Sequence, residues 1–159
     1  MKKTLLTFAA LFASTLSILA QSGNPLATFK INQTGGEFTM TLASTEAATS
    51  YSVDFGDGNL VTAATTQAYD GWDGSVEISG TPAAGSTVKI YSTGKITYLQ
   101  AFGKTTASRI ETADVTKLVD LTDLDLHNNQ LATIDLSQNT KLKKLDLNNN
   151  SFTSINLAA

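Results

Sequence analysis

The sequence predicts a mainly β protein, and two observations carry this prediction. Short runs of alternating apolar and polar residues recur between residues 24 and 99, with Gly, Asp, Asn, Ser and Thr between them. This alternation is typical of half-buried strands. From residue 100 onward, one pattern of apolar residues returns at a constant spacing, which indicates stacked repeats. We therefore expect a small β-sandwich over residues 24–99, followed by a short repeat solenoid over residues 100–159.

Six alternating runs predict the strands of the sandwich. The runs at residues 29–31 and 38–42, with the turn residues Gly35 and Gly36 between them, predict a hairpin with one apolar face. The run at residues 51–55 stops at a Gly-Asp-Gly turn. Further short strands are expected around residues 76–78, 88–90 and 96–98. About six or seven short strands separated by turns favour a sandwich.

Two acidic turns lie in the predicted sandwich, at residues 54–58 and 69–74. Their carboxylates could be calcium ligands, although their spacing does not match an EF-hand loop. The favoured interpretation is that Asp side chains accept bonds from nearby backbone N–H groups while Gly adopts positive φ. No other cofactor is expected. Trp72 is expected to cover one end of the sandwich, and the alternative is an exposed ring that stacks on a sugar.

The second part of the chain contains two clear copies of one pattern. Seven positions of the first copy return at one and the same spacing: Leu121, Leu124, Leu126, Asn129, Leu131, Ile134 and Leu136 recur as Leu142, Leu145, Leu147, Asn150, Phe152, Ile155 and Leu157. This is the leucine-rich repeat pattern L-x-x-L-x-L-x-x-N-x-L. The L-x-L cores predict parallel strands, and Asn129 and Asn150 are expected to stack as a ladder that bonds backbone groups. A helix is disfavoured because asparagines interrupt the run.

A partial earlier copy precedes these two. Residues 110–115 align with residues 131–136, which end the first full copy, and the strand of the partial copy is expected within residues 96–102. A few extra residues are expected around positions 104–108. At the other arm of the coils we expect stacked turn residues that bond local backbone N–H groups: Asp114, Asp135 and Asn156.

The polar positions of the repeat strands are the candidate ligand-binding face. They are Asp123, Asp125, His127 and Asn128 in one coil, and Lys144, Asp146, Asn148 and Asn149 in the next. Neighbouring strands lie about 4.8 Å apart, so Asp123 is expected beside Lys144 and Asp125 beside Asp146. The face is either an acidic ligand surface, with or without a bridging cation, or an ordinary solvated surface, which is favoured. His127 is expected at the surface without a catalytic or metal role.

Composition excludes several functions. With 42% hydrophobic and 16% charged residues among 159, the chain is not expected to be disordered. A net charge of −3 without a basic run argues against a nucleic-acid partner. The absence of cysteine excludes disulfides, thiolate metal sites and cysteine nucleophiles, and the single histidine excludes multi-histidine metal sites.

Residues 1–20 are expected to be a secretory signal peptide. Lys2 and Lys3 give a positive start, residues 5–13 are mostly apolar, and Ala20 is the small residue that a signal peptidase prefers. The stretch is too short to predict a membrane span, and the alternative is an N-terminal anchor that stays uncleaved. The sequence thus predicts a secreted or cell-surface protein without a transmembrane anchor.

The two parts resemble known families at these motifs. Residues 51–58 resemble the strand-and-turn signature of PKD-like domains, with Val53 in place of the usual tryptophan. Residues 96–159 resemble the leucine-rich repeats of secreted Bacteroidota surface proteins, and the segment 134–142 is especially typical. The order of signal peptide, sandwich and repeats is also similar to these surface proteins, which are similar to internalin-like adhesins. The resemblance implies an Ig/PKD-like β-sandwich before the repeats, and protein or glycan binding at the cell surface.

These observations predict a binding protein without catalytic activity that acts in adhesion or in protein or glycan interaction. One alternative is a structural spacer or a truncated fragment, because the sequence stops at Ala159, shortly after Leu157, and leaves an open apolar edge for a partner or for missing repeats. The other is a glycan hydrolase that uses Asp125 and Asp146, held roughly 5 Å apart on adjacent strands. A shallow face without an enclosed pocket argues against hydrolysis.

Overall fold

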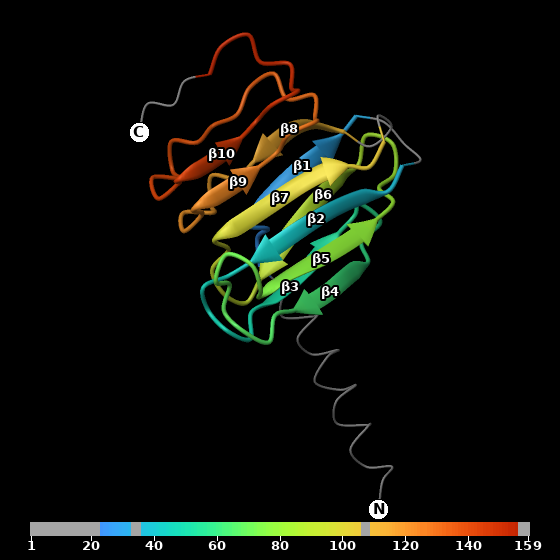
Figure 1. The fold of residues 1–159 in the computed structure, drawn as a ribbon. Helices are drawn as coiled ribbons and strands as arrows, with labels where there is room; N and C mark the ends of the chain where they lie inside the picture. The colour runs from blue at the N-terminus through green and yellow to red at the C-terminus, as the bar shows by residue number, and fades with distance from the viewer. Residues whose placement is uncertain (1–22, 33–35, 106–108, 156–159) are drawn as a thin grey trace, which may run out of the picture.

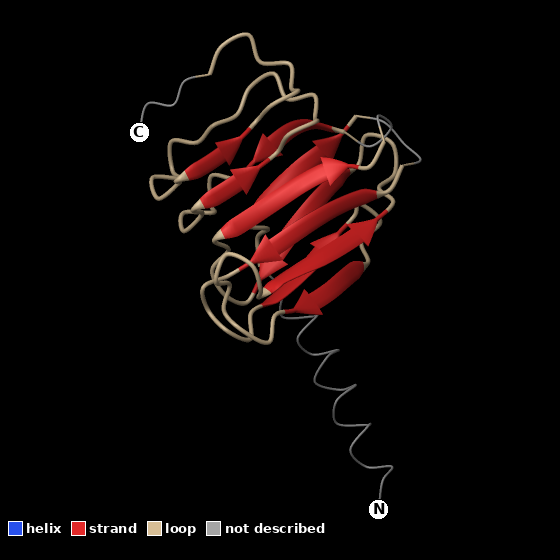
Figure 2. Cartoon of the chain, in the orientation of Figure 1, coloured by secondary structure: helices blue, strands red, loops and turns tan. Residues whose placement is uncertain are grey.

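The computed structural model describes residues 23–32, 36–105 and 109–155. The predicted signal peptide and Asn156 lie outside these ranges. All regular secondary structure in the described ranges consists of strands, which confirms the prediction of a mainly β protein (Figure 2). None of the described residues forms a helix long and apolar enough to cross a membrane.

Within the described ranges, ten strands form two five-stranded sheets (Figure 1). The first sheet has the order β4 (Leu60–Ala64), β3 (Ser50–Asp54), β6 (Thr87–Ser92), β1 (Ala27–Ile31) and β8 (Ile110–Asp114). The second has the order β10 (Lys144–Asp146), β9 (Asp123–Asp125), β7 (Tyr98–Gly103), β2 (Phe38–Ala43) and β5 (Ser75–Gly80).

The two sheets lie face to face and share one apolar core (Figure 1). Phe29 and Ile90 from the first sheet, and Met40 and Leu99 from the second, are completely buried in it. The period-two alternation of each strand places these side chains on the inner face. Burial of this apolar surface is the main favourable contribution to folding.

The predicted hairpin between residues 29–31 and 38–42 is wrong. β1 pairs with β6 and β8, whereas β2 pairs with β5 and β7, so the two strands lie in opposite sheets. Alternation identifies the face that a strand buries, but it does not identify the neighbouring strand. β4 was not predicted, because it lies at the edge of its sheet and all of its residues are at least partly exposed.

The repeats continue the second sheet without a break. β9 pairs in parallel with β7, where Leu99 lies opposite Leu124, and β10 pairs in parallel with β9, where Leu124 lies opposite Leu145. β7 is therefore the strand of the predicted partial copy. The step along the chain from Leu99 to Leu124 is longer than the step from Leu124 to Leu145, because the first coil carries four extra residues.

This first coil also joins the two sheets. Its strand β7 lies in the second sheet, and β8, later in the same coil, pairs with β1 in the first sheet. The predicted boundary between residues 99 and 100 falls within β7. The division into two domains stays a prediction, which an unfolding experiment can test.

Candidate functional site

The outward side chains of β9 and β10 lie in the predicted register. Leu124 is buried, while the residues on either side of it in β9 are partly exposed. Asp123 lies opposite Lys144, and their side chains form an ion pair of 3.0 Å. Asp125 lies opposite Asp146. Both predicted pairs are confirmed.

The predicted asparagine ladder holds these strands in place. The Asn129 Nδ2 group donates to the backbone oxygens of Ala101 in the preceding coil and Leu126 in its own, at 3.0 and 2.9 Å. The Asn129 Oδ1 atom accepts from the N–H of Ile110 at 2.9 Å.

Asn150 repeats the arrangement one coil later, with bonds to Leu126, Leu147 and Leu131. The ladder is confirmed for both residues.

The acidic residues at the other turns bond local backbone, as expected. Asp114 accepts from the N–H of Thr116 at 3.0 Å, and Asp135 accepts from the N–H of Ser137 at 2.9 Å. One further buried side-chain amide was not predicted from the sequence. Asn139 donates to the oxygens of Val115 and Leu118 in the coil before it. Its place in a turn rich in polar residues gives no local signal that this side chain, and not its neighbours, points inward.

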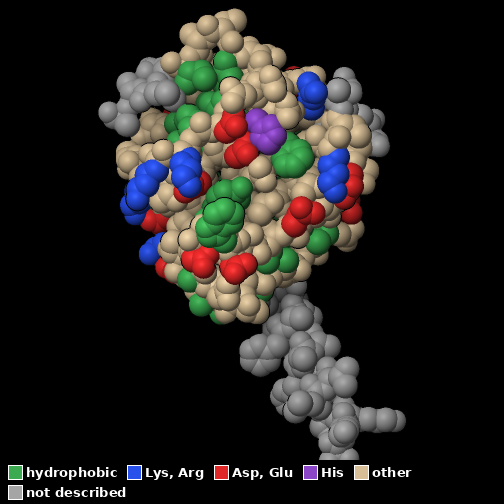
Figure 3. Space-filling model, viewed as in Figure 1, with side chains coloured by type: hydrophobic (Ala, Val, Ile, Leu, Met, Phe, Trp, Pro, Cys, Tyr) green, Lys and Arg blue, Asp and Glu red, His purple; other side chains and the backbone are tan. Residues whose placement is uncertain are grey.

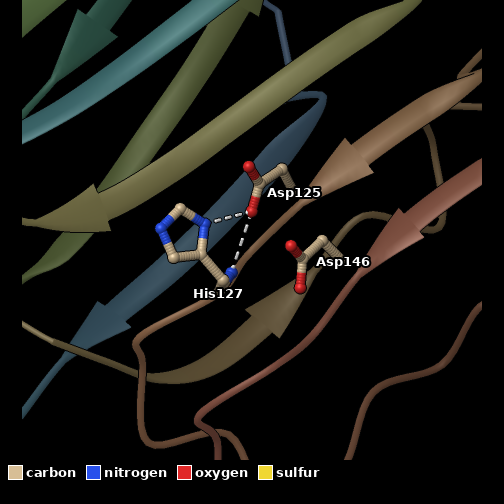
Figure 4. Close-up of side chains that lie close together, drawn as sticks. All are labelled: Asp125, His127 and Asp146. Atoms are coloured by element: carbon tan, nitrogen blue, oxygen red, sulfur yellow. Dashed lines mark hydrogen bonds and ion pairs between the residues drawn. The ribbon is translucent and has the colours of Figure 1, made fainter.

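Asp125 lies at the centre of a polar cluster (Figure 4). Its Oδ1 atom accepts from the N–H of His127 at 3.1 Å and is hydrogen-bonded to the Nδ1 atom of the same residue. Its Oδ2 atom accepts from the Nε2 group of Gln100 at 2.7 Å. Burial by itself would raise the pKa of Asp125, but the bonds from His127 and Gln100 outweigh burial and lower the pKa.

Asp146 points toward this cluster from the neighbouring strand (Figure 4). Asp125, His127 and Asp146 each offer one possible ligand atom, and these atoms lie within 4.8 Å of one another. In the described part of the chain they are the group that could hold a metal ion. Three closely spaced ligand atoms do not by themselves establish a metal site, so we assign no metal to the cluster.

The two acidic turns of the first part are local structures. Asp54 accepts from the N–H groups of Gly56 and Gly58, at 2.7 and 3.0 Å, and pairs with Lys89 at 3.2 Å. Burial would raise the pKa of Asp54, and these bonds outweigh it and lower the pKa. Gly56 and Gly58 both have positive φ, at 97° and 80°. The interpretation of residues 54–58 as a capped turn is confirmed.

The prediction that Trp72 covers an end of the sandwich is wrong, because 92% of this residue is exposed. The Asp70 Oδ1 atom accepts from the N–H groups of Trp72 and Asp73, both at 2.9 Å. Gly71 and Gly74 have φ of 105° and 85°. These hydrogen bonds fix the backbone of the tight turn over residues 69–74, and the indole ring extends into solvent.

A groove of about 240 Å³ runs over the candidate face, and two tyrosines line one side of it. The Tyr69 and Tyr98 rings lie 5.3 Å apart between centroids, at 43° to one another. We call this the tyrosine groove; its polar and aromatic lining residues are Tyr69, Tyr98, Asp123, Asp125, Lys144 and Asp146. Figure 3 views this side of the molecule, where acidic, basic and hydrophobic side chains lie close together.

Four of the eight residues of the predicted ligand-binding face line the tyrosine groove: Asp123, Asp125, Lys144 and Asp146. His127 lies beside it, partly buried against the Phe102 ring at a centroid distance of 5.4 Å. Asn148 does not join this group. It follows β10 and lines a separate groove of about 380 Å³, together with Leu145, Leu147, Phe152 and Ile155.

Neither tyrosine was predicted from the sequence. Tyr98 lies opposite Asp123 in the parallel pairing of β7 with β9, so it occupies an outward position of the partial copy. Shifting the register of the partial copy by its four extra residues would have identified Tyr98 as an outward residue. Tyr69 belongs to an acidic turn far away in sequence, and no local signal places it beside the repeats.

Comparison with known proteins supports the assignment of the repeats. Residues 110–159 match the family described as leucine rich repeats (2 copies). Searches of the curated proteins and of the solved structures found no match. Residues 110–159 are therefore similar to leucine-rich repeats, and repeats of this kind suggest a role in protein–protein interaction.

Proposed function

We propose that this protein binds a protein partner on the face formed by β7, β9 and β10. The tyrosine groove is the observation that carries the proposal. It places two aromatic rings beside three carboxylates and one ammonium group on the outward positions of repeat strands. Aromatic residues are enriched at protein interfaces, and repeat proteins commonly bind through such an extended face.

Asp125 supports binding rather than hydrolysis. A glycosidase needs one carboxylic acid that stays protonated near neutral pH, which requires a raised pKa. The pKa of Asp125 is lowered, because hydrogen bonds from His127 and Gln100 outweigh the effect of burial. Asp125 is therefore ionised near neutral pH and is a hydrogen-bond acceptor rather than a proton donor.

The setting that we propose is the cell surface or the medium, where the protein acts in adhesion. The predicted signal peptide and the resemblance to secreted repeat proteins support this setting, and the capped turn after β3 supports an Ig/PKD-like first part. An antibody against residues 24–99 is expected to detect the protein in the envelope or the medium, without residues 1–20. Detection only in the cytosol would contradict the proposal.

A photo-cross-linking amino acid tests the binding face. We would place it at Lys144, whose side chain is 83% exposed at the groove, and, as the control, at Val61, which is 44% exposed on β4 of the opposite sheet. On the cell surface that the protein is expected to bind, protein adducts are expected from position 144 and not from position 61. Equal adducts from both positions, or adducts that carry glycan but no protein, would contradict the proposal.

A further inference from the structure

The tyrosine groove contains negative charge that the described residues do not balance. Asp123 pairs with Lys144. None of the ion pairs among the described residues joins a lysine or an arginine to Asp125 or Asp146. Three carboxylates and one ammonium group line the groove, so its acidic groups outnumber its basic group by two.

The free acceptor capacity of the groove lies mainly on Asp146. The described residues give this side chain one hydrogen bond, from the N–H of Asn148 to Oδ1 at 2.9 Å. A carboxylate can accept about four hydrogen bonds. Asp146 therefore keeps acceptor sites for a ligand, whereas the three hydrogen bonds of Asp125 hold that carboxylate in a set orientation.

The tyrosine side of the groove favours positive charge. The face of an aromatic ring carries negative electrostatic potential and attracts cations. Burial raises the pKa of Tyr98, and the nearby Tyr69, Asp125 and Asp123 raise it further, which shows that the carboxylates act on this ring. Both the rings and the carboxylates therefore stabilise a cation between them.

The volume of the groove limits the size of its occupant. Pockets for drug-sized molecules measure about 300–1,000 Å³, and the tyrosine groove, at about 240 Å³, is smaller. A space of this size suits a single long side chain that projects from a larger partner.

We propose that the tyrosine groove receives an arginine side chain of the protein partner, with the guanidinium group against Tyr69 and Tyr98 and its N–H groups donating to Asp146. This inference rests on the proposed function, because it describes the chemistry of a partner at the same face. The guanidinium group is flat, stacks on aromatic rings and donates to carboxylates while stacked. The ammonium group of lysine is compact and strongly hydrated and has no flat face to stack, so it fits this arrangement less well.

The test uses the intact secreted protein, labelled with ¹⁵N, and two small probes. N-acetyl-arginine amide is titrated against N-acetyl-citrulline amide, which has nearly the same shape but no charge. The arginine probe is expected to shift the backbone amides of β7, β9 and β10 and to bind at least about tenfold more tightly than the citrulline probe. Raising the salt concentration is expected to weaken the binding.

Matched variants locate the binding. Asp146→Asn keeps an acceptor for the N–H of Asn148 and removes one charge from the groove, so it is expected to weaken arginine binding about tenfold. Glu111→Gln removes one charge from β8 in the opposite sheet and is expected to leave arginine binding unchanged. The melting temperature of each variant confirms that it is folded.

Three outcomes would overturn the inference: equal binding of both probes, shifts confined to other strands, or shifts of the groove by methyl glucoside but not by the arginine probe. Failure here is distinguishable from failure of the proposed function. Protein adducts at position 144 without arginine binding would leave the protein-binding face in place and remove only the arginine. Arginine binding without protein adducts would instead contradict the proposed function.

Discussion

Asn129 joins two successive coils of the repeat through one side chain. It is 2% exposed, and it bonds backbone groups of β7, of its own coil and of residue Ile110. Backbone groups that are buried without a partner cost free energy, so each of these bonds removes a penalty. This explains why an asparagine, with both a donor and an acceptor, returns at the same position of the next coil.

Replacing Asn129 with Ala is expected to lower the free energy of unfolding by about 1–3 kcal/mol, because the N–H of Ile110 and the oxygen of Ala101 lose their partner. Asn150→Ala is expected to cost less, because Asn150 is only partly buried. Urea unfolding followed by circular dichroism measures both. Equal midpoints for wild type and Asn129→Ala would contradict the ladder.

Asp54 makes stability depend on pH. Its pKa is lowered in the folded protein from 3.8, because bonds from Gly56, Gly58 and Lys89 outweigh burial. The stabilisation is therefore complete well above pH 3.8 and is lost as the pH falls through the folded pKa. Asp54→Asn is expected to cost about 1–3 kcal/mol at pH 7 and progressively less below about pH 4. Thermal melts across this range measure the difference, and Glu77→Gln, at an exposed position of β5, is the control, with little expected change.

At the scale of elements, the turn over residues 69–74 connects the first part of the chain to the repeat face. Its backbone is held by Asp70 and by the bond from the Tyr69 N–H to the Ser44 oxygen at 2.7 Å. Tyr69 lines the groove, and Trp72, further along the same turn, extends into solvent. A large exposed aromatic on a fixed turn is typical of a binding anchor.

Trp72→Ala is therefore expected to change the free energy of unfolding by no more than about 0.5 kcal/mol, because the ring makes few contacts within the fold. The same variant is expected to reduce the yield of protein adducts from the cross-linker at position 144. Val61→Ala, at another exposed apolar residue, is the control. A large loss of stability in Trp72→Ala would show that the ring packs on the protein, and an unchanged adduct yield would exclude it from the interface.

At the scale of the whole molecule, the repeat register was predictable and the strand partners were not. The constant spacing of the two full copies determines which residues of β9 and β10 lie opposite one another, so the pairs at Asp123 and Asp125 followed directly. The neighbours of β1 and β2 depend on contacts between segments far apart in the chain, on which local alternation carries no information. Tyr69 reaches the groove for the same kind of reason, through the tertiary fold.

Because the sheets run through both parts of the chain, we expect residues 23–155 to unfold as one unit. β9 pairs with β7, β7 pairs with β2, and the apolar core extends without interruption from Phe29 to Leu126 and Leu131. Leu126 is completely buried, so Leu126→Ala is expected to cost about 2–5 kcal/mol. In a cooperative unit this loss reaches every strand, including β3 at the far side of the first sheet.

Native-state hydrogen exchange measures this coupling at single amides. The most protected amides of β3 and β9 are expected to have the same free energy of opening in the wild type, and Leu126→Ala is expected to lower both by the same amount. Ala63→Gly on β4 tests the reverse direction, because a weakened edge strand of a single unit also lowers the protection of β9. If Leu126→Ala lowered the protection of β9 while β3 kept its own, the repeats would be a separate folding unit, and the boundary near residue 100 would be the correct division of the chain.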